Sequence, residues 1–104
     1  MLKRDFATDR PDHKWLADIT YIPTQEGWLY LAAILDLYSR LIVGWAMSDR
    51  MTSALTLDAL KMAIQQRKPG PGLIHHSDQG SQYTDSTYQA LLKEHNIQAS
   101  INSV

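Results

Sequence analysis

The chain of 104 residues contains no cysteine. It can therefore form no disulfide and no thiolate metal site, so any metal ion must be held by oxygen or nitrogen ligands. The absence of cysteine also fits a reducing compartment.

Long apolar runs are absent as well. The longest, from Trp28 to Leu35, has the length of a strand and falls well short of the ~20 residues that a membrane span needs. The residues from Met1 to Phe6 lack the apolar stretch of a signal peptide. We therefore expect no membrane association and a cytoplasmic location.

An excess of positive charge is the third missing feature. Ten Lys and Arg stand against eleven Asp and Glu, which gives a net charge of −1. Dedicated DNA-binding proteins usually carry a clear basic surplus, so composition by itself predicts no nucleic-acid binding. The hydrophobic share of 44% is that of an ordinary globular protein, and the length suits one domain.

Hydrophobic patterning predicts one folded unit after a short lead-in. Residues 1–14 are aperiodic and of mixed charge, whereas residues 15–104 alternate between strand and helix patterns. Gly27 fits the positive-φ position of a hairpin, and Pro69 to Gly72 end the first helix. Strands are expected at 15–22, 28–36, 41–48, 73–77 and 97–101, and helices at 52–67 and 85–96.

This order, βββαβαβ, predicts an α/β protein with a mixed five-stranded sheet. A right-handed crossover through the first helix would place strand 73–77 parallel to and beside strand 15–22. The arrangement resembles the ribonuclease-H-like fold without its last helices. The second strand is almost continuously apolar, so we expect it to be covered on both faces. Trp15, Trp28 and Trp45 are each expected in the core.

Two aspartates are the strongest candidates for chemistry. Asp18 lies in the middle of an apolar strand, where a carboxylate needs a partner, a cation or a solvated cleft. Asp78 ends the fourth strand, and ligand sites in open α/β sheets form beyond the carboxyl ends of strands. Structural readings remain open, because Asp18 could be hydrogen-bonded at the sheet surface and Asp78 could form a turn. If their strands are adjacent, however, the pair suits Mg²⁺ or Mn²⁺.

Other acids are less suited to join this pair. With a hairpin centred on Gln25, Asp18 should lie opposite residue 32, which puts Asp36 ~13 Å away along the strand. Asp36 is instead expected to fix the turn to Ser39 and Arg40. Glu94 and Glu26 are expected to be solvated.

Polar and aromatic residues near Asp78 are candidates for contact with DNA. Of His75 and His76, one is expected to face the core with a hydrogen bond, and the other to lie in a cleft beside Asp78. Tyr83, in the polar loop that follows, is the best candidate to line that cleft. Gln79 and His76 complete the predicted nucleic-acid-binding set.

The ordered motifs closely resemble those of bacterial insertion-sequence transposases with a retroviral-integrase-like (DDE) catalytic core. The resemblance extends from about residue 8 to residue 100 and is specific because the motifs occur together. They are Asp9–Tyr21, Glu26–Leu31, Leu35–Arg40, Val43–Met47 and His75–Tyr83.

The resemblance implies Mg²⁺-dependent (or Mn²⁺-dependent) DNA strand cleavage and strand transfer, acting on transposon ends and target DNA in a bacterial cytoplasm. It also assigns the first two metal-binding acids to Asp18 and Asp78. Family members carry a glutamate roughly thirty-five residues after the second aspartate, a position beyond Val104. We therefore expect residues 15–104 to form an integrase catalytic core that lacks its C-terminal catalytic helix. An alternative is an inactive remnant that forms a homodimer or associates with a full-length transposase.

Overall fold

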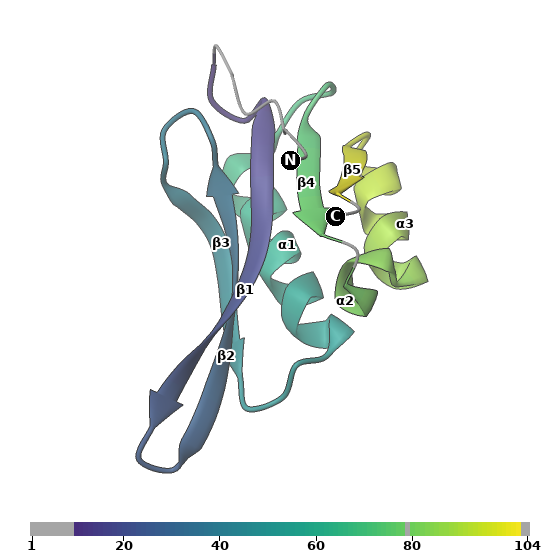
Figure 1. Ribbon diagram of the computed structural model, residues 1–104. Helices are drawn as coiled ribbons and strands as arrows, with labels where there is room; N and C mark the ends of the chain where they lie inside the picture. The colour runs from purple at the N-terminus through teal and green to yellow at the C-terminus, as the bar shows by residue number, and fades with distance from the viewer. Residues whose placement is uncertain (1–9, 79, 103–104) are drawn as a thin grey trace.

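The computed structural model describes residues 10–78 and 80–102. One five-stranded sheet has the strand order β3-β2-β1-β4-β5, with β2 antiparallel to its two neighbours β1 and β3, and β4 parallel to both β1 and β5 (Figure 1). The elements are β1 (Lys14–Thr24), β2 (Gly27–Asp36), β3 (Ile42–Ser48), α1 (Ser53–Arg67), β4 (Ile74–Asp78), α2 (Ser81–Thr84), α3 (Ser86–Glu94) and β5 (Gln98–Asn102).

The predicted sheet is confirmed, including the parallel placement of β4 beside β1. Gly27 has a φ of 127° at the hairpin turn, as expected. Asp85 caps α3 by accepting hydrogen bonds from the backbone N–H groups of Thr87 and Tyr88. The short helix α2 was not predicted; it occupies part of what had been expected to be a polar loop.

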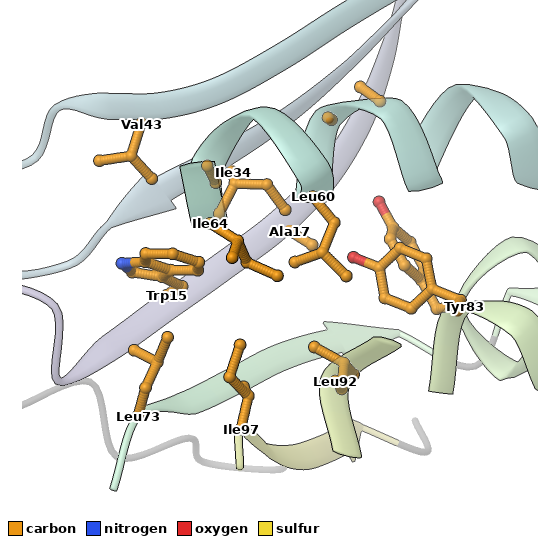
Figure 2. Packing of buried hydrophobic residues seen from close by; sticks show 14 of the residues in the cluster. Trp15, Ala17, Ile34, Val43, Leu60, Ile64, Leu73, Tyr83, Leu92 and Ile97 are labelled. Carbon is orange, nitrogen blue, oxygen red and sulfur yellow. The ribbon is translucent and has the colours of Figure 1, made fainter. Parts of the chain in front are cut away.

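The core lies between the sheet and the helices, on one face of the sheet only. Trp15 and Ile34 from the strands pack with Leu60 of α1 and Leu92 of α3 (Figure 2). Tyr88 of α3 belongs to the same cluster. Buried and more accessible positions alternate from Trp15 to Asp18 in β1 and from Ala32 to Asp36 in β2, as they do in a sheet covered on one side. The expectation that the second strand is covered on both faces is therefore wrong for the described residues.

Two of the three tryptophans lie outside the core, contrary to prediction. Trp15 is fully buried, but Trp28 is 56% exposed and Trp45 is 48% exposed. Trp28 is near the tip of the β1–β2 hairpin, which projects beyond the helices (Figure 1). Trp45 points to the open face of the sheet, because it pairs with Ala33 on the side opposite to Ile34. Among the described helices, none is long and apolar enough to cross a membrane.

Candidate metal-binding site at the end of the β1–β4 pair

The two candidate aspartates lie side by side at the place where β1 and β4 separate. The last paired residues of these strands are Leu16 and His76, and each aspartate follows two residues later on its own strand. Because side chains two residues apart lie on the same face of a strand, Asp18 and Asp78 share the open face of the sheet. Both are exposed. The predicted adjacency on parallel strands is confirmed.

A pocket of about 150 Å³ holds both carboxylates. Its walls come from β1, from the segment before α1, and from the loop and helix that follow β4. The lining residues are Asp18, Ile19, Met51, Asp78, Gly80, Gln82 and Tyr83.

Backbone N–H groups fix one oxygen of each carboxylate. The Ile19 N–H donates to Oδ1 of Asp18 at 2.9 Å, and the Gly80 N–H donates to Oδ1 of Asp78 at 2.8 Å. A side chain at Gly80 would place its Cβ 2.9 Å from Oδ1 of Asp78 and 2.7 Å from Oε1 of Gln82. Glycine therefore leaves the space between Asp78 and Gln82 open, and the second oxygen of each aspartate is available to a ligand.

Tyr83 lines the pocket, as predicted, but it offers little surface to DNA. Its side chain is packed in the core and the residue is only 3% exposed. The ring makes an edge contact with Tyr88 at a centroid distance of 5.4 Å and lies 6.2 Å from the ring of His75. Burial raises the pKa of Tyr83, and the negative charges of Asp18 and Asp78 raise it further. The phenol is therefore neutral at physiological pH and closes the inner end of the pocket.

His75 is the core-facing histidine, as predicted. Its Nε2 and the hydroxyl of Tyr88 lie 2.7 Å apart, and burial lowers the pKa of His75 to about 4. The imidazole is therefore neutral at pH 7 and has a structural role. His76 was expected in an open cleft, but it is only 8% exposed and does not line the pocket. β4 continues past His76 and ends at Asp78. Gln79 lies outside the described residues.

Asp36 takes no part in the pocket, as expected. The hairpin turns between Gln25 and Glu26, so Asp18 pairs with Ala33 and not with residue 32. Asp36 then lies three residues farther along β2 and on the opposite face of the sheet. It is fully buried and accepts hydrogen bonds from the backbone N–H and the hydroxyl of Ser39, at 3.2 and 2.7 Å. These bonds confirm its predicted role in the turn.

Comparison with known proteins decides the family. The Integrase core domain model matches residues 8–104. The chain belongs to this family. This integrase core chain also has relatives among curated proteins. It is 50% identical over 103 residues to the transposase InsF of insertion sequence IS3A from Escherichia coli K12, and 48% identical over 102 residues to the transposase of IS904 from Lactococcus lactis.

These two relatives are longer proteins. The matches cover 99% and 98% of this integrase core chain but only 36% and 40% of the relatives' length. Solved structures confirm the ribonuclease-H-like integrase fold. One such structure is the simian T-cell lymphotropic virus intasome in complex with the PP2A regulatory subunit B56 gamma. The match covers 98% of the present chain and 34% of the matched intasome chain, with a TM-score of 0.79 and 20% sequence identity. The structure of the HTLV-2 integrase catalytic core domain in complex with magnesium is similar over 89% of the present chain and 62% of its own length. Its TM-score is 0.75 and its sequence identity is 21%.

The donor atoms of this integrase core fit a hard divalent cation. Asp18 and Asp78 supply carboxylate oxygens, the ligands that Mg²⁺ and Mn²⁺ prefer, in a pocket open to water that can complete the coordination. The loop at Gly80 keeps the space beside Asp78 clear. Within residues 10–78 and 80–102, no third acid or histidine joins the pair to make a metal-binding cluster.

Four residues that line the pocket were not predicted from the sequence: Ile19, Met51, Gly80 and Gln82. Gln82 follows Asp78 by four residues, in the same motif, and this closeness in sequence was a signal that it could line the pocket. The helix α2, which contains Gln82, brings it there. Met51 precedes α1 in the chain and is 44% exposed. Nothing in its local pattern indicates a place beside Asp18, because only the packing of α1 on the sheet brings it there.

Proposed function

We propose that this chain is the part of a transposase catalytic core that supplies the first two metal-binding acids for DNA strand cleavage and strand transfer. One observation carries the proposal: Asp18 and Asp78 extend from adjacent parallel strands into one solvent-open pocket. Paired carboxylates at such a position suit the binding of divalent cations for phosphoryl transfer.

In this proposal each residue of the pocket has a defined task. Asp18 and Asp78 hold Mg²⁺ or Mn²⁺, while the N–H groups of Ile19 and Gly80 keep the carboxylates oriented. Tyr83 closes the inner end, so a DNA phosphodiester can enter only from the open side. When bound, the cations lower the pKa of an attacking water and neutralise charge on the phosphate oxygens.

Cleavage is proposed for the longer protein and not for this chain by itself. The chain spans 36% of the InsF transposase that it matches, and the described residues supply no third acid to the pocket. Two carboxylates anchor an ion, but positioning both reacting oxygens needs a further ligand across the cleft. A bacterial cytoplasmic location and transposon-end and target DNA as substrates belong to the same proposal.

A chimera tests this function. Replacing the matching segment of E. coli IS3 InsF with this chain should give a transposase that cleaves and joins labelled IS3 ends with Mn²⁺, because half of the residues are identical. The Asp18→Asn and Asp78→Asn chimeras should lose at least ~10³-fold of this activity, since each removes a metal ligand.

Controls separate failure of folding from failure of the proposal. Asp58→Asn alters an exposed acid on α1, away from the pocket, and should leave the chimera active. A chimera that melts cooperatively and binds IS3 ends but neither cleaves nor joins them would contradict the proposal. Full activity in the Asp78→Asn chimera would do so as well. The unextended 104-residue chain should show no cleavage in the same assay.

We also propose that the open face of the sheet associates with a second copy of this chain. Around β3 this face carries large apolar side chains in contact with solvent: Ile42 is 57% exposed, Trp45 48% and Met47 50%. Contiguous apolar surface of this kind marks interaction sites in soluble proteins. If the partner is a full-length transposase and not a second copy, we expect it to bind through the same exposed side chains of β3.

Light scattering measures this association. Trp45→Lys with Met47→Lys should shift the chain toward monomer at ~100 µM, because two charges would have to be desolvated at the contact. Tyr38→Lys with Leu41→Lys, two exposed apolar residues in the β2–β3 turn, is the matched control. A wild-type chain that is monomeric at ~100 µM would contradict homodimerisation.

A further inference from the structure

The end of the molecule away from the carboxylate pocket concentrates basic residues, which we call the basic pole: Arg10, Arg40, Arg67 and Lys68. They come from three segments that meet there, namely the turn before β1, the β2–β3 turn and the end of α1 (Figure 1). Asp78 lies at the other end of β4, which runs away from this pole.

Hydrogen bonds tie the three segments together and engage the acids of the pole. Nε of Arg67 donates to both oxygens of Asp12, at 2.9 and 3.2 Å. The Asp12 N–H donates to Oδ1 of the buried Asp36 at 3.1 Å, and the backbone N–H of Arg40 donates to the carbonyl oxygen of Asp36 at 2.8 Å. Both carboxylates are thereby bonded within the protein, whereas Arg40 and Lys68 are exposed. The surface of the pole is therefore positive.

The backbone at Arg40 and Lys68 carries an independent sign of function. Both have left-handed conformations, with φ of 63° and 45°, at places where glycine or asparagine would be less strained. Lys68 occupies the C-cap of α1, a position that favours a left-handed residue. A cation near a helix C-terminus is favoured by the helix dipole, but this does not apply to Arg40, which lies in a turn between strands. The left-handed backbone of Arg40 therefore has no such helical explanation, and strain held at an exposed cation favours a use for its charge.

We propose that the basic pole binds the phosphodiester backbone of DNA, as a contact separate from the carboxylate pocket. Guanidinium and ammonium groups at the meeting point of three rigidly bonded segments suit phosphate oxygens, and such contacts position a duplex without reading its sequence. The net charge of −1 spread over the whole chain does not oppose this, because the positive charge is local. The inference rests on the proposed function only in taking DNA as the polyanion.

The test measures DNA affinity and stability together. The Arg40→Gly/Lys68→Gly double variant of the 104-residue chain and the wild type are titrated into a fluorescent ~25-bp duplex in EDTA, from 20 to 200 mM salt. Removing two phosphate contacts should lower the slope of log affinity against log salt by about 2. Relief of the left-handed strain should raise Tm by roughly 5 °C, so weaker binding cannot be ascribed to unfolding.

A matched variant removes the same charge elsewhere. Lys61→Gln/Lys93→Gln changes two exposed lysines on α1 and α3, away from the pole, and should retain the wild-type slope. An equal loss in both double variants would show an effect of net charge alone and would overturn the proposal, as would a wild-type chain without measurable affinity at 20 mM salt. EDTA removes divalent ions, so the outcome is independent of metal binding at Asp18 and Asp78. A failure of the proposed function would appear in the chimera and not here.

Discussion

The Gly44→Ala substitution is expected to lower Tm by at least ~12 °C. Gly44 lies on β3 directly beneath α1, and an added Cβ would overlap the carbonyl oxygen of Ala59 and lie 2.7 Å from both the amide nitrogen and Cβ of Ala63. Most of these atoms belong to the helix backbone, so no side-chain rotation relieves the overlap. Forcing α1 away from the sheet should cost about 3 kcal/mol or more, a large part of the stability of a domain this small.

Thermal melts followed by circular dichroism measure this effect against a matched control. Gly70→Ala makes the same chemical change at a position where the new Cβ would meet nothing within 4 Å. Its Tm should stay within ~3 °C of wild type. A Gly44→Ala variant as stable as Gly70→Ala would mean that α1 does not pack on β3 as closely as described. Because Met51 precedes α1 and lines the pocket, the same displacement would alter one wall of the metal site.

The sequence was sufficient to predict the path of the chain through the sheet. Strand patterns and Gly27 identify the β1–β2 hairpin, and the handedness of crossovers places β4 beside β1. Which faces of the sheet are covered could not be predicted in this way. The sequence of an apolar strand such as β2 is the same whether one face or both faces of the sheet are covered. The exposed Trp45 on the neighbouring β3 shows that only one face is covered. Gly44 within a strand did offer a signal of close backbone approach.

The positions of the two acids were predictable and the rest of the pocket was not. Asp78 ends a strand and Asp18 lies on its neighbour, so topology alone brings them together. Tyr83 was expected at a cleft because it follows Asp78 in a polar segment. The formation of α2 turns its ring into the core, where it contacts Tyr88. Such tertiary packing leaves no trace in local polarity.

Asp18→Asn and Asp78→Asn are each expected to weaken Mn²⁺ binding by more than ~30-fold, because each replaces one of two anionic ligands by a neutral amide. The amide oxygen of asparagine can still accept the hydrogen bonds from Ile19 N–H and Gly80 N–H. Both variants should therefore fold, with Tm equal to or above that of wild type, since removing one of two neighbouring like charges relieves repulsion. Asp58→Asn, on the exposed side of α1, serves as the control and should bind as wild type does.

Paramagnetic line broadening by Mn²⁺ tests the paired-carboxylate site most directly, because it locates the ion on the backbone. In ¹H–¹⁵N spectra of the 104-residue chain, substoichiometric Mn²⁺ should broaden the amide signals of Ile19 and Gly80 first and leave those of Gly27 and Gly70 sharp. The same signals should remain sharp in Asp18→Asn and Asp78→Asn. Broadening centred elsewhere on the chain, or unchanged broadening at Ile19 and Gly80 in both variants, would contradict the assignment of Asp18 and Asp78 as the metal ligands.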